Sequence, residues 1–182
     1  MRLLLAAAAV ATIAAAPAIP GPAAAAAAPA ACVGKWTEDS RGRSSVDGSE
    51  IAYDDESSFA DAVAHARKVW TAKPMTKVRV FPDGATAYAD VEFRDVDSTK
   101  APWTDIYGLW DAQQGTDVIY LNKAYLLTTG IRRTIAAHEL GHALGFCHKD
   151  HRRYATLMAE RSGDMADAPT AQDKKNYTAL WG

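Results

Sequence analysis

The chain has 182 residues, of which 48% are hydrophobic and 23% are charged, and its formal net charge at pH 7 is −2. The sequence contains neither a basic patch of the kind that binds nucleic acid nor an acidic tail, so we expect no nucleic-acid partner. Its length suits a single domain built around one hydrophobic core.

Residues 1–31 are typical of a secretory signal peptide. A positive start at Met1-Arg2 precedes an apolar run to about Ile19, and alanine-rich sequence then offers small-x-small cleavage points between about Ala23 and Ala31. An N-terminal membrane anchor is the alternative, but four prolines before residue 30 argue against a long spanning helix. We therefore expect a secreted, extracellular protein, without stable membrane association once the signal is cleaved. We also expect a monomer.

The remainder, residues 32–182, reads as one domain in which short strands and helices follow one another. Apolar residues at helical spacing predict a helix over about 58–72, and alternating residues predict strands before and after it. The expected strands cover residues 50–53, 77–81, 87–93, 106–110 and 117–121. Further helices are expected over about 131–146 and 170–181, the last one capped by Thr170. This order predicts an α+β fold, with helices packed against a sheet.

The stretch AAHELGHALGFCHKD, residues 136–150, carries the chemistry. His138 and His142 are four residues apart, so a helix presents both imidazoles on one face. Glu139 follows the first of them, beside the expected ion. Gly145 suits the left-handed turn that ends a helix, after which His148 can approach the same ion. Three neutral histidines leave the fourth position of one Zn²⁺ ion open, as in catalytic zinc sites.

Other polar residues have alternative interpretations. His151 is a competing third ligand, although the offset of His148 from Gly145 fits the pattern better. His65 is expected on a helix surface and not at a metal. Calcium is possible but unsupported for a group of acidic residues, for which a solvated loop is the preferred interpretation. This group consists of Asp95, Asp97, Asp105 and Asp111.

The histidine pattern resembles the elongated zinc signature of the metzincin metalloproteases. That family has a methionine turn beneath the metal, for which Met158 in Thr156–Ala159 is the candidate. Supporting similarity runs from residue 51 to 182 and makes the chain resemble a minimal matrixin-type catalytic domain. Snapalysin-type proteases are similar in size, but their third ligand is Asp where this chain has His148.

The resemblance implies a zincin-like fold: a twisted mixed sheet of four or five strands, a zinc-binding helix, an N-terminal helix and a C-terminal helix. It also implies that an extended substrate lies along the 106–111 strand, with Gly108 and Leu109 on the rim of the cleft. The pocket for the side chain after the cut is expected between the zinc-binding helix and the segment after Met158. No second histidine cluster lies between residues 94 and 115, so no structural zinc site is expected there.

The two cysteines, Cys32 and Cys147, are expected to form a disulfide, because a secreted chain with an even number of cysteines usually pairs them. Two alternatives concern Cys32 alone. It lacks the preceding leucine of a lipid-anchored cysteine. It also lacks the Pro-Arg-Cys-Gly-like setting of a matrixin latency switch.

These residues predict a secreted zinc-dependent endopeptidase that hydrolyses protein or peptide substrates, with Glu139 as the general base for a zinc-activated water. One alternative is a catalytically silent zinc-binding or adhesion module of the same fold. A zinc hydrolase acting on cell-wall material is another. Zinc binding without cleavage of an unstructured protein would favour the silent module.

Overall fold

The computed structural model describes residues 28–39, 44–84 and 88–182. Most of the predicted signal peptide lies outside the described residues, and only residues 28–31 of it belong to the described part. In chain order the elements are β1 (Glu50–Asp55), α1 (Ala60–Trp70), β2 (Arg79–Pro82), β3 (Val91–Val96), β4 (Gly108–Asp111), β5 (Asp117–Asn122), α2 (Thr129–Ala143), the 3-10 helix η1 (Ser162–Asp164) and α3 (Ala171–Trp181).

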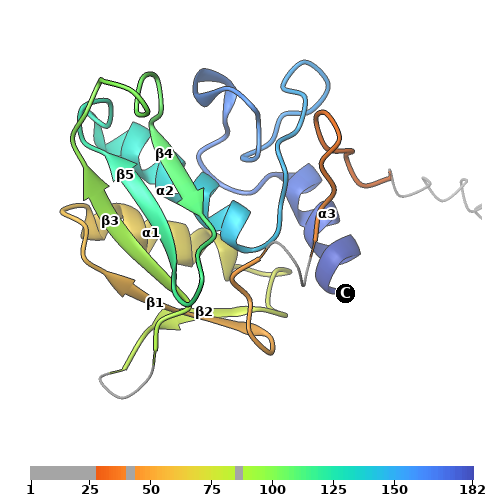
Figure 1. Ribbon diagram of the computed structural model, residues 1–182. Coiled ribbons are helices and arrows are strands. Elements are labelled where there is room, and N and C mark those ends of the chain that lie inside the picture. Colours follow the sequence, from red (N-terminus) through yellow and green to blue (C-terminus); the bar gives the residue numbers. More distant parts are fainter. Residues whose placement is uncertain (1–27, 40–43, 85–87) are drawn as a thin grey trace, which may run out of the picture.

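The strands form one mixed sheet with the order β2-β1-β3-β5-β4 (Figure 1). Neighbouring strands are parallel except for β4, which pairs antiparallel with β5 and lies at the edge. The predicted α+β class with a mixed sheet of four or five strands is therefore confirmed. β3 begins at Val91, within the predicted strand 87–93, whose first residue lies outside the described residues; just before β3, the Asp90 side chain accepts the Ala52 N–H (2.7 Å).

α1 and α2 pack together against the sheet and supply much of the core (Figure 1). The buried residues of α1, from Ala62 to Trp70, recur at helical spacing, so they form one apolar face. Trp70 is fully buried, and its indole N–H donates to the Ala137 carbonyl of α2 at 2.6 Å. This hydrogen bond sets the position of α2 relative to α1, and this position sets where the side chains of α2 point.

α2 ends at Ala143, earlier than the predicted end at 146. Gly145 adopts φ +90°, a left-handed conformation that glycine accepts readily. A Cβ at Gly145 would also collide with the Asp39 carbonyl oxygen. The turn therefore needs glycine for two reasons, its backbone angle and the close approach of the N-terminal segment.

α3 begins with a capping box in which Thr170 and Asp173 each accept from the other's backbone N–H. Asp173 is buried and also accepts the Leu157 N–H at 2.9 Å. The ring of Tyr177 stacks on Phe146, which attaches α3 to the turn after α2.

No helix in the described part of the chain has the length and hydropathy needed to cross a membrane.

Candidate metal centre

Three histidine side chains converge where α2 meets the segment that follows it. His138 and His142 lie on α2, and His148 approaches them after the Gly145 turn. Their Nε2 atoms form a triangle in which each pair is 3.1 Å apart. The structure thus brings together the three residues predicted as ligands.

Backbone carbonyls orient two of these rings. The Nδ1 atom of His138 lies 2.8 Å from the Leu157 carbonyl, and that of His142 lies 2.8 Å from the Phe146 carbonyl. Because a carbonyl oxygen only accepts, each Nδ1 must carry the proton. Each Nε2 then presents a lone pair to the centre of the triangle, as in many histidine metal sites.

These atoms fit a zinc ion. Nitrogen ligands at about 2.0–2.1 Å from a tetrahedral zinc ion are about 3.3–3.4 Å apart, close to the observed spacing. Burial lowers the pKa of His138 well below its usual value, and the nearby His142 lowers it further. Burial also lowers the pKa of His148, against an opposing effect of Glu160. Both rings are therefore neutral near pH 7, which is the form that binds a metal.

Glu139 lies beside the triangle, with one carboxylate oxygen accepting the Trp110 N–H of β4 at 2.9 Å. Burial raises its pKa to about 8, and the Trp110 hydrogen bond opposes that rise. A cation held by the three histidines would favour the carboxylate form, because an opposite charge nearby lowers the pKa of an acid. Glu139 therefore suits proton transfer near neutral pH.

Gly108 of β4 passes directly against Glu139. A Cβ there would lie 2.9 Å from Glu139 Cγ and 2.6 Å from Ile135 Cγ2. Glycine lets the edge strand approach α2 closely enough for the Trp110 N–H to reach the carboxylate. The predicted rim residue Gly108 thus has a second role, in the placement of Glu139.

Met158 is buried and packs against Gly141 of α2, where a Cβ would collide with the Met158 sulfur. The Lys149 N–H donates to the Met158 carbonyl at 2.7 Å. The chain therefore folds back after His148, which brings Leu157 beside His138, whereas the place of Met158 beneath a metal stays a prediction.

Cys32 and Cys147 form a disulfide, so the N-terminal segment is covalently joined to the residue before His148. We call residues 30–39 the N-terminal strap. The Val33 N–H donates to the His148 carbonyl at 2.9 Å, and the Asp39 N–H donates to the Gly145 carbonyl at 3.1 Å. The strap thus runs along the loop that carries the third histidine.

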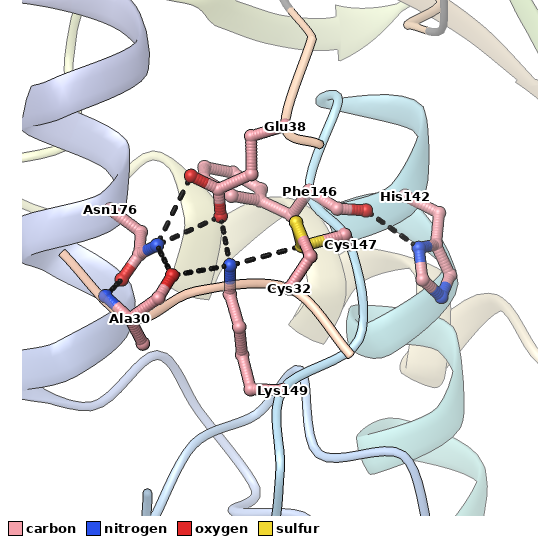
Figure 2. Close-up of a disulfide and its surroundings, with 8 residues drawn as sticks. All are labelled: Ala30, Cys32, Glu38, His142, Phe146, Cys147, Lys149 and Asn176. Carbon is pink, nitrogen blue, oxygen red and sulfur yellow. Dashed lines mark hydrogen bonds and ion pairs between the residues drawn. A yellow bond between two sulfur atoms is a disulfide. The ribbon is translucent and has the colours of Figure 1, made fainter. Parts of the chain in front are cut away.

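A buried lysine, Lys149, binds the strap through its side-chain ammonium (Figure 2). The Lys149 side chain is 2% exposed, and its ammonium contacts Glu38 Oε1 at 2.6 Å, the Ala30 carbonyl at 2.9 Å and Cys147 Sγ at 3.1 Å. The Asn176 side chain of α3 donates to Glu38 and Ala30 and accepts the Ala30 N–H. Ala30, within the predicted signal peptide, is therefore buried against the domain.

A cleft of about 570 Å³ opens beside Glu139, His142 and His148. β4 forms one wall through residues 108–111, including Gly108 and Leu109, and the strap residues Trp36 and Thr37 contribute to the lining as well. The segment after Met158, expected to bound a substrate pocket, does not line this cleft, whereas the 145–148 loop does. His138 lies beneath the surface at 2% exposure.

Other residues considered from the sequence lie elsewhere. His151 contacts Glu160 at 3.0 Å and groups with Asp150, apart from the histidine triangle. Nε2 of His65 lies 2.9 Å from the Asp167 carbonyl. Of the groups with three converging metal-ligating atoms in the described ranges, none includes the four acidic residues considered for calcium.

Sequence reasoning missed the groups that orient the site. The Trp110 N–H and the carbonyls of Leu157 and Phe146 are backbone groups, so residue type carries no signal for them. Lys149 was also missed. The residues that follow Lys149, from Asp150 to Arg153, are all polar or charged, so the sequence carries no signal that this lysine is buried. No known protein family matches the chain, and no curated protein does.

Proposed function

We propose that this chain is a secreted zinc endopeptidase of the metzincin class, closest to a matrixin-type catalytic domain. The observation that carries the proposal is the triangle of Nε2 atoms 3.1 Å apart, next to a buried Glu139 in an open cleft. When bound there, zinc supplies Lewis acidity, which lowers the pKa of a water towards about 7 and polarises a peptide carbonyl.

The other steps belong to the residues of the chain. Glu139 accepts the proton of the attacking water and delivers it to the leaving amine. The Trp110 N–H holds one carboxylate oxygen of Glu139, and Glu139 lines the cleft in which the proton transfer takes place. The carbonyls of Leu157 and Phe146 keep the protons of His138 and His142 on Nδ1, which leaves Nε2 for the metal.

An extended peptide pairs with the edge of β4. The Asn122 N–H donates to the Tyr107 carbonyl, so the main-chain groups of Tyr107 point towards β5. This direction alternates along an antiparallel strand, so the main-chain groups of Gly108 and Trp110 point away from β5, towards the outer edge of the sheet. The cleft borders this outer edge. A substrate strand can therefore add to the sheet through main-chain hydrogen bonds beside Glu139. Secretion is supported by the leader sequence and by the disulfide, which persists in oxidising compartments.

The test uses the purified protein and its Glu139→Gln variant. We expect the native protein to bind about one zinc ion and to cleave an unstructured protein, with activity lost on chelation and restored by zinc. The Glu139→Gln variant should keep its zinc and lose turnover. Zinc binding without cleavage by the native protein would support the silent binding module instead. Near-native activity of the variant would refute the role of Glu139.

A further inference from the structure

The N-terminal strap is fixed on both sides of Trp36. On one side Cys32 is bonded to Cys147, and the Val33 N–H donates to the His148 carbonyl. On the other side Glu38 pairs with the buried Lys149, and Figure 2 shows that carboxylate held between Lys149 and Asn176. Trp36 therefore sits on a short segment whose two ends are attached to the loop of the third histidine and to α3.

The Trp36 side chain lines the cleft while 59% of the residue remains exposed. A large aromatic side chain usually loses most of its surface on folding, and exposed apolar groups beside a functional site often contact a ligand. Leu109 of β4, 39% exposed, also lines this cleft, as does Phe146. The lining thus gathers apolar side chains from the strap, the edge strand and the turn after α2.

We propose that Trp36 and Leu109 form a subsite for an apolar or aromatic side chain of the substrate. The inference rests on the proposed function, because the occupant is a peptide paired to β4, and the subsite is continuous with the cleft beside Glu139. A peptide strand alternates its side chains, so one set of positions faces the cleft lining. The exposed Trp36 is an aromatic residue that such a side chain can contact, and the attached strap holds Trp36 in place without a large loss of entropy on binding.

Cleavage assays on matched peptides test this specificity. Quenched peptides that carry Phe, Leu or Gly at one position at a time are compared for the native protein, Trp36→Ala and Trp36→Phe. We expect one peptide position to occupy the subsite. For peptides with Phe or Leu at that position, Trp36→Ala should lower kcat/KM about tenfold, because one aromatic contact is lost. For peptides with Gly at that position, kcat/KM should change little. Trp36→Phe should retain most of the preference.

Tyr88→Ala is the control, because Tyr88 is 96% exposed and does not line the cleft. It should leave every peptide unaffected. Equal losses for all peptides in Trp36→Ala, or an unchanged Phe and Leu preference, would overturn the proposal.

A binding measurement separates this proposal from the proposed function. Calorimetry on the Glu139→Gln background compares the Kd of the Phe and Gly peptides with and without Trp36→Ala, and needs no turnover. If the native protein cleaves no peptide, the endopeptidase proposal fails. A Phe preference in binding that depends on Trp36 would still support the subsite, and its absence would refute it.

Discussion

The buried carboxylic acid of Glu139 makes the metal-free protein sensitive to pH in a direction that can be calculated. Burial raises its pKa from 4.5 to about 8, so between these values the folded chain keeps a proton that the unfolded chain releases. The free energy of unfolding therefore falls as pH rises through this window. One proton changes it by about 1.4 kcal/mol per pH unit, which amounts to at most about 5 kcal/mol by pH 8.

Glu139→Gln removes this contribution because the amide does not titrate. In urea denaturation with chelator present, from pH 5 to 8, we expect the stability of the variant relative to the native protein to rise by about 1.4 kcal/mol per pH unit. The histidines are common to both proteins, so the stability that each loses below about pH 6.5, the usual histidine pKa, cancels in the difference. Saturating zinc should flatten this dependence. A difference that does not change with pH in the metal-free proteins would show that Glu139 is already ionised at pH 5, and would refute the reasoning.

Three further substitutions or truncations test the supports of the site. Gly108→Ala would place a Cβ 3.0 Å or less from Glu139, so kcat of the proposed endopeptidase should fall at least tenfold with zinc content unchanged; equal activity would contradict the close approach. Lys149→Met leaves the Glu38 carboxylate without its buried partner, and urea denaturation should show a loss of about 3–5 kcal/mol that adding Glu38→Gln largely restores. A chain beginning at Cys32 lacks Ala30 and its hydrogen bonds to buried side chains, so it should be less stable than one beginning at residue 28, by about 1–3 kcal/mol in the same assay.

The sequence was most informative where structure depends on near neighbours. His138 and His142 were predictable as a pair because helical geometry alone places residues four apart on one face. Gly145 was predictable as a turn because its conformation depends on its own backbone, although the helix before it ends at Ala143. The strands and helices lie where spacing predicted them, with their ends shifted by a few residues.

Tertiary structure decided what surrounds the histidines. The contacts between Trp110 and Glu139, and between Leu157 and His138, join residues 29 and 19 positions apart and use backbone groups that every residue carries. The strap depends on contacts over more than 100 positions, such as Lys149 with Glu38. The hydrophobic period and the residue types of a segment indicate which face of that helix or strand is buried. They do not indicate which other segment covers that face. The sequence alone therefore determined the candidate ligands and base, whereas the fold decided how the base is held and what lines the cleft.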